Sequence, residues 1–157
     1  MPVRFLRNAS ELADVSWETP LPVQVANAKP VPTDTLLVAT TSVDTTANRD
    51  LLGSTSTELP TLDGCMQYRK LVWFFFRAGA DATTYRVLAR ATDHNGAPLG
   101  TGWQEIVPAT TLPGAANSWG RIEIPSTGDG YYDQYRIEVQ RTAGSNYTLT
   151  SKIVGVR

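Results

Sequence analysis

Residues that act in catalysis are few in this chain, and their spacing matches no common reaction signature. The sequence has one histidine, His94, and one cysteine, Cys65. His94 stands between Asp93 and Asn95 in a stretch typical of a turn, whereas a nucleophile–histidine–acid relay needs an imidazole held beside a serine or cysteine. No phosphate-binding glycine loop, dinucleotide fingerprint or His-Glu-x-x-His zinc helix is present. We therefore expect neither nucleophilic catalysis nor nucleotide or zinc chemistry.

Carboxylates remain as candidates, because a glycosidase needs only two of them facing each other across a cleft. Glu123 and Glu138 alternate with apolar neighbours, so pairing with Arg121 or Arg136 on an adjacent strand is the stronger interpretation. Sequence spacing places none of these side chains in a common cleft, and we expect a protein that is not an enzyme. The carboxylates considered are Glu105, Glu123, Asp129, Asp133 and Glu138.

Two acidic stretches contain oxygen ligands of the kind that calcium prefers. They are the segment 129–133 and the group Asp44, Asn48 and Asp50. Each lacks the full ligand spacing, and turn-forming roles explain the same residues more simply. We therefore predict no metal and no cofactor.

Aromatic residues near predicted loops or strand ends offer a different kind of site, because a planar ring stacks on the apolar face of a sugar. The candidates are Trp103, Trp119, Tyr131 and Tyr132. Packing in a core is the simpler role for most of them. The solvent accessibility of Trp103 and Trp119 distinguishes a glycan platform from rings that are buried or at a protein contact.

Charge and length exclude several broad classes of function. The chain has 157 residues and a formal net charge of −1, whereas nucleic-acid binding calls for a strongly basic face. Residues 1–66 carry four positive and eight negative side chains, and residues 67–157 carry ten and seven, so the two parts have opposite net charges. No apolar run is long enough for a signal peptide or a membrane span. We expect a protein made in a cytoplasm, with neither nucleic acid nor membrane as partner.

Twelve of the fourteen aromatic residues follow Met66, which leaves Phe5 and Trp17 for the preceding part. Aromatic side chains supply much of the apolar area of cores and interfaces. The sequence therefore predicts a self-sufficient C-terminal body and an N-terminal segment that depends on another surface. We expect the division at residues 1–35 and 36–157.

The N-terminal segment contains signals for a short helix and then for extended chain. The stretch from Asn8 to Glu11 has the form of a capping box and predicts one or two helical turns. Four prolines between Pro20 and Pro32 favour extended geometry, and 23–25 can add to a sheet edge, within the chain or on a partner. The apolar residues expected to anchor this arm to a partner are Phe5, Leu6, Leu12, Trp17, Leu21, Val23 and Val25.

The rest of the chain predicts six to eight short strands and almost no helix. Leu36–Val43 has the composition of a strand, and 44–64 is a long polar loop that either hides a strand near 55–59 or binds a partner. The apolar run from Leu71 to Phe76 predicts a strand that is central or at a contact between subunits. This pattern indicates an all-β antiparallel sandwich or jelly roll. Further strands are expected at 84–92, 101–107, 118–125, 132–142 and 147–156, the last two forming a terminal hairpin.

The layout of these features resembles small virion proteins of tailed bacteriophages. The resemblance rests on the short helix, the proline-spaced segment 21–32, the threonine-rich linker and the closing strands between Tyr135 and Val156. Among these proteins it is closest in kind to capsid decoration, or cement, proteins. It implies a β-rich body seated on a capsid shell, an arm that binds the major capsid protein or other virion subunits, a homo-oligomer and no catalysis. A tail, neck or fibre component, and a carbohydrate-binding or host-recognition module, are the alternatives.

Overall fold

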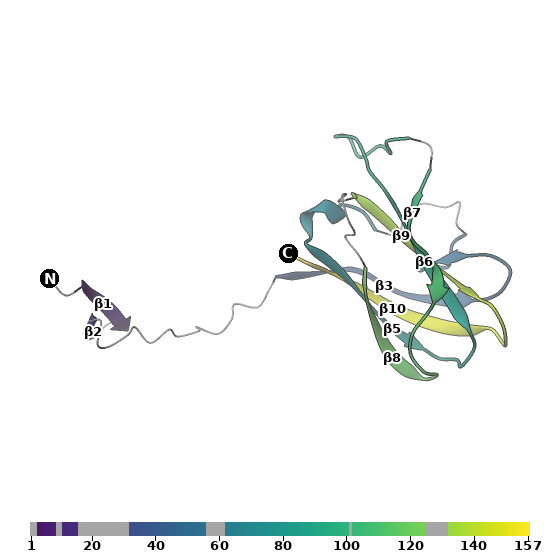
Figure 1. Ribbon diagram of the computed structural model, residues 1–157, viewed down its shortest axis with the longest axis horizontal. Helices are drawn as coiled ribbons and strands as arrows, with labels where there is room; N and C mark the ends of the chain where they lie inside the picture. Colours follow the sequence, from purple (N-terminus) through teal and green to yellow (C-terminus); the bar gives the residue numbers. More distant parts are fainter. Residues whose placement is uncertain (1–2, 9–10, 16–31, 56–61, 101, 125–131) are drawn as a thin grey trace. The chain divides into compact units, whose positions relative to one another are not determined.

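The computed structural model describes residues 3–8, 11–15, 32–55, 62–100, 102–124 and 132–157 (Figure 1). The chain divides into two compact units, Met1–Val31 and Pro32–Arg157. The division therefore falls between Val31 and Pro32, rather than after residue 35 as the sequence suggested.

The described part of the N-terminal unit is a two-stranded antiparallel hairpin. Strand β1 (Val3–Asn8) pairs with β2 (Glu11–Val15), with Leu6 opposite Leu12 and Asn8 opposite Glu11. The short helix predicted from Asn8 to Glu11 is wrong, because Glu11 begins a strand. Its signal was ambiguous: residues that cap helices, such as asparagine and serine, also favour turns.

The body is an antiparallel β-sandwich of two four-stranded sheets, which confirms the predicted fold class (Figure 1). The order in the first sheet is β3 (Thr33–Val43), β10 (Tyr147–Val156), β5 (Lys70–Arg77) and β8 (Ser118–Ile124). The order in the second sheet is β4 (Arg49–Asp50), β9 (Gln134–Arg141), β6 (Thr83–Arg90) and β7 (Gln104–Thr111).

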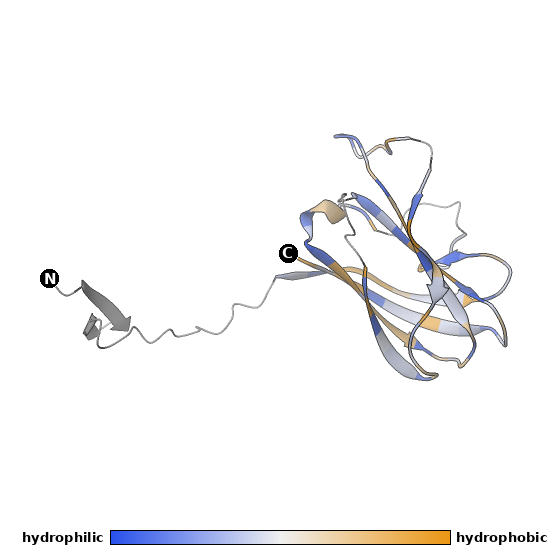
Figure 2. Ribbon diagram, viewed as in Figure 1, coloured by the Kyte–Doolittle hydropathy of each residue, from blue (hydrophilic) through white to orange (hydrophobic). Residues whose placement is uncertain are grey.

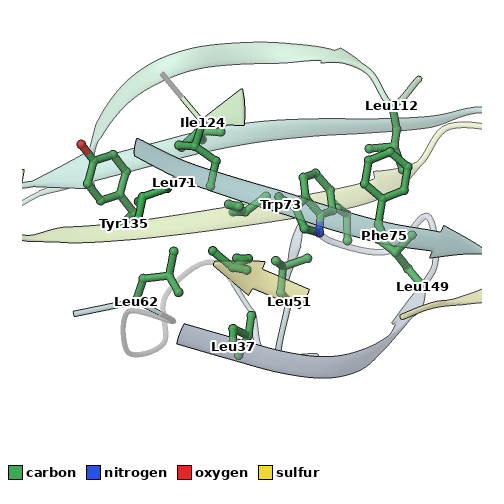
Figure 3. Close-up of a cluster of buried hydrophobic side chains, with 14 of the residues drawn as sticks. Leu37, Leu51, Leu62, Leu71, Trp73, Phe75, Leu112, Ile124, Tyr135 and Leu149 are labelled. Carbon is green, nitrogen blue, oxygen red and sulfur yellow. The ribbon is translucent and has the colours of Figure 1, made fainter. Parts of the chain in front are cut away.

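The core lies between the sheets, and strand β5 contributes its largest side chains. Trp73 and Phe75 are completely buried, with ring centroids 4.8 Å apart. Figure 3 shows them with Leu71 among side chains from both sheets. Apolar and polar residues are interleaved along the strands (Figure 2), as expected when one face of each strand is buried. The apolar run therefore marks a strand inside its sheet, between β10 and β8.

The last two strands do not form the predicted terminal hairpin. Strand β9 pairs with β4 and β6, whereas β10 pairs with β3 and β5 in the other sheet. The connection between them turns at Gly144, whose φ is +89°, and the Asp81 side chain accepts a hydrogen bond from the Ser145 N–H at 2.7 Å. A Cβ at position 144 would overlap Asp81. This tight corner carries the chain from one sheet to the other, so Tyr135 on β9 and Leu149 on β10 enter the core from opposite sheets.

The long polar loop contributes to the sandwich at its described positions. Strand β4 is short and Thr55 bridges back to Arg49, while Leu51 and Leu62 lie in the core. The Asp50 carboxylate accepts hydrogen bonds from two backbone N–H groups that follow it. The strand expected near 55–59 falls mostly outside the described residues.

Helix is almost absent from the described residues. One 3-10 turn, η1 (Cys65–Gln67), precedes β5. Within the described part of the chain, no helix has the length and apolarity needed to span a bilayer.

Candidate binding surfaces

The predicted anchor residues of the arm divide into two groups. Phe5, Leu6 and Leu12 lie in the β1–β2 hairpin, where Phe5 is opposite Ala13. The other four anchors, Trp17, Leu21, Val23 and Val25, lie outside the described residues. The structure thus brings three of the seven onto one small hairpin.

The outer face of the first sheet exposes apolar side chains, and we call it the open face. It is formed by the outward-facing residues of β3, β10, β5 and β8. Val38 is 68% exposed and Trp119 is 69% exposed, while Phe74 between them is 36% exposed. The ring of Phe76 lies 5.4 Å from that of Trp119. Exposed apolar side chains grouped on one face commonly mark an interaction site.

The open face also carries charged side chains at the β8 edge. Glu123 forms ion pairs with Lys70, at 2.6 Å, and with Arg121. These cations, Lys70 first, hold the pKa of the Glu123 carboxyl below its usual value. All three side chains are well exposed, so the pairs contribute little to stability.

The outer face of the second sheet has the opposite character, and we call it the closed face. Arg136 and Glu138 on β9 are completely buried there, and Leu88 on β6 is buried beside them. Two nitrogens of Arg86 lie 2.7 Å from Glu138 Oε2, and Arg136 Nη1 lies 3.7 Å from Glu138 Oε1. Burial lowers the pKa of the Arg136 guanidinium. Oppositely charged neighbours offset the cost of removing these groups from water.

Trp103 belongs to the closed face and is only partly accessible. The guanidinium carbon of Arg90 lies 4.4 Å from the ring centroid, and that of Arg136 lies 4.6 Å away. Such cation–π contacts hold the ring in place. The two tryptophans whose accessibility tests for a glycan platform therefore differ in exposure. Trp103 is held by two cations, and Trp119 faces solvent.

Of the remaining aromatic candidates, Tyr132 is held by contacts within the body. Tyr132 donates a hydrogen bond to Gln104 at 3.0 Å and packs against the Tyr135 ring. Tyr131 lies outside the described residues.

The carboxylates expected to be structural have cationic or backbone partners where they are described. Glu105 lies 3.6 Å from Arg86, and Asp133 accepts hydrogen bonds from the N–H and hydroxyl of Thr92. The pairing predicted for Glu123 and Glu138 is present, but their cross-strand partners are Lys70 and Arg86. Glu138 lies on the outer face of its sheet, as the sequence suggested, but it is buried there. Asp129 lies outside the described residues.

The other candidates for chemistry are the cysteine and the histidine. Burial first, and then the nearby carboxylates of Asp63 and Asp133, raise the pKa of the Cys65 thiol to about 12, so the reactive thiolate is suppressed. His94 is exposed in the Asp93–Gly96 turn, where Gly96 has a φ of +80°. Among the described residues, no group of three or more potential metal ligands is found.

A polar cluster fixes the place where the N-terminal segment joins the body. The Asp34 carboxylate accepts hydrogen bonds from the Tyr68 hydroxyl at 2.9 Å and from Arg157 at 3.0 Å. These two donors, Tyr68 first, lower the pKa of Asp34. The backbone N–H of Arg157 donates to the carbonyl of Pro32 at 3.0 Å. The C-terminus is thus tied beside the start of β3.

The closed face and the joining cluster were not identified from the sequence. Arg86 and Glu138 occupy alternate positions on their strands, as exposed polar residues also do, and their burial depends on what covers the sheet. The exposed position of Trp119 was one of the outcomes considered.

In comparisons with known proteins, the chain matches no protein-family model, no curated protein and no solved structure.

Proposed function

We propose that this chain is a non-enzymatic structural protein of a bacteriophage virion that decorates and stabilises the capsid shell. The observation that carries the proposal is the N-terminal unit, Met1–Val31, whose described part is a two-stranded hairpin. An isolated hairpin is marginally stable in water. Such a unit gains stability when it packs on another molecule, and the major capsid protein or another virion subunit would supply that surface.

The body supports this proposal because it holds its own core. Among the residues from 32 to 157 whose burial is described, the buried core residues run from Leu37 to Ile153. A body of this kind can sit on a shell while the N-terminal segment makes the attachment.

A capsid shell offers many identical binding sites, and this repetition strengthens weak attachment. Ordering an extended segment costs about 1–2 kcal/mol per backbone residue, which apolar anchors and backbone pairing must offset. When many copies bind side by side, each contact is reinforced by its neighbours, so modest affinity per copy suffices. We therefore place the protein in the virion, as a homo-oligomer or a regular array assembled in the host cytoplasm.

Deletion of residues 1–31 tests this proposal. The truncated chain should keep the cooperative unfolding of the body but lose its place on particles, measured by sedimentation and quantitative mass spectrometry of purified virions. Occupancy equal to that of the full chain would contradict the proposal.

A double substitution, Leu6→Ser with Leu12→Ser, tests the hairpin without shortening the chain. These residues are opposite each other in the register, so losing both should reduce occupancy strongly. Leu99→Ser alters an exposed leucine of the body and serves as the matched control. Imaging of the particle then separates a shell location from a tail, neck or fibre location by the symmetry of the bound copies.

Carbohydrate recognition is a second candidate function, and the exposure of Trp119 favours it. A ring that is 69% exposed on a flat sheet face is available for stacking on a sugar. A host-recognition module and a decoration protein are compatible, because the hairpin and the open face belong to different units of the chain.

A further inference from the structure

The open face arranges its side chains in two neighbouring cross-strand rows. Each row crosses all four strands of the sheet, with one residue from each strand. The first row is Val38, Lys152, Phe74 and Arg121, and the second is Thr40, Thr150, Phe76 and Trp119.

The second row supplies a stacking ring with hydroxyl groups across the sheet from it. Phe76 packs beside Trp119, which supports the indole while most of its surface stays exposed. Thr40 and Thr150 lie further along the row, with their hydroxyl oxygens 3.4 Å apart. A ring combined with hydroxyl donors suits a ligand that has both apolar and hydroxylated surfaces.

The first row supplies cations. Lys152 is exposed, and no described carboxylate forms a salt bridge with it. Arg121 shares Glu123 with Lys70, and Lys152 adds a third cation, so cations outnumber carboxylates in this part of the open face. Lys152 and Arg121 stand two strands apart, about 10 Å at the backbone. A short oligosaccharide spans this separation.

The same charges disfavour a second copy, or a dry protein surface, as the occupant. Two copies of this face packed together would bring an excess of cations into one interface, and like charges in contact are costly. Lysine is depleted from the centre of protein interfaces, yet Lys152 lies between Val38 and Phe74. A hydrated anionic ligand fits this arrangement better.

We propose that the open face binds an acidic polysaccharide, with Trp119 stacking on a sugar ring and Lys152 and Arg121 binding sugar carboxylates. This inference rests on the second candidate function and is independent of the proposed attachment to a capsid. Charge-assisted hydrogen bonds to carboxylates supply specificity, and the aromatic ring supplies apolar contact.

A titration of the full-length chain tests the proposal. The acidic probes are oligogalacturonate, oligomannuronate, sialyllactose and a hyaluronan hexasaccharide, and the neutral probe is cellohexaose. Binding is measured by calorimetry and by NMR shifts of the Trp119 indole N–H. We expect at least one acidic probe to shift this signal, with weaker binding at higher salt because the charges are exposed.

Variants then assign the contacts. Trp119→Ala should weaken binding about tenfold, and Lys152→Met or Arg121→Met by about tenfold or more. The matched controls are Arg69→Gln, which removes an exposed cation outside the two rows, and Leu99→Ala, which removes an exposed apolar side chain. Both controls should bind as the unchanged chain does.

Three outcomes would overturn the proposal. They are the absence of a Trp119 shift with every acidic probe at millimolar concentration, equal binding of cellohexaose, or a Trp119 shift that depends on protein concentration alone. The last result would identify the open face as a contact between copies. None of these measurements uses a virion particle, so their outcome does not test the proposed attachment to a capsid.

Discussion

The outer faces of the two sheets differ in the side chains that they bury and expose. The closed face buries charge, with Glu138 enclosed by Arg86 and Arg136 and with cations held over Trp103. The open face leaves Trp119 and Val38 in water. Ion-paired buried charges on one face and exposed apolar side chains on the other indicate that the first face serves the fold and the second is available for binding.

The largest expected difference between the faces concerns their carboxylates. Glu138→Ala should lower the free energy of unfolding by about 3–5 kcal/mol, because it leaves buried arginine charge uncompensated. Glu123→Ala, the matched change on the open face, should cost less than about 1 kcal/mol. Urea denaturation of both variants measures this difference, and equal losses would refute the distinction between the faces.

The tryptophans provide the next comparison. Trp103→Ala should destabilise the body by about 2–3 kcal/mol, because it removes the ring against which Arg90 and Arg136 pack. Trp119→Ala should cost less than about 1 kcal/mol, since only the contact with Phe76 is lost. Chemical denaturation followed by far-ultraviolet circular dichroism avoids relying on tryptophan emission. A larger loss for Trp119→Ala would reverse the comparison.

Gly120 on β8 lies directly against the buried ring of Phe75. A Cβ at Gly120 would fall within the Phe75 ring, so Gly120→Ala should cost about 1–3 kcal/mol through overpacking. Gly102 has no neighbouring atom within 4 Å of such a Cβ, and Gly102→Ala is the control. If the two variants unfold at the same temperature, the backbone of β8 is not held close to Phe75.

The smallest expected effect is a pH dependence on the open face. Cations beside Glu123 depress its pKa below the usual 4.5, so its stabilising contribution is present above that value. The contribution is lost as the pH falls through the lower pKa of the folded state. Lys70→Gln should raise the pKa of Glu123, measured by NMR titration of its carboxyl carbon. An unchanged titration midpoint would contradict the ion pair.

Much of the body could be predicted from the sequence because strand signals are local. The alternation around Val87 and the apolar run ending at Phe76 located β6 and β5, and the Asn95-Gly96 pair located a turn. Each signal depends on a few neighbouring residues and on the two-residue period of a strand.

The pairing of strands and of charges was harder to predict, because it depends on residues that are far apart in the sequence. Nothing near Gly144 in the sequence distinguishes a hairpin from a corner between sheets, which depends on distant Asp81. The two-residue strand β4 is too short to produce a pattern. Likewise, Glu138 has the spacing of an exposed residue, and its burial depends on chain far from it in sequence. Of the candidate sites, the ring of Trp119 was named from the sequence, although packing in a core was the simpler expectation for it, and the neighbouring cation Lys152 was not considered.

The hydrogen bond between Arg157 and the carbonyl of Pro32 has a practical consequence for labelling. A fluorophore or affinity tag fused after Arg157 emerges where the polypeptide enters β3, next to the only covalent tether of the hairpin unit. A bulky fusion at that position should obstruct the proposed docking of the hairpin unit, whereas a small dye there should report on that docking by energy transfer.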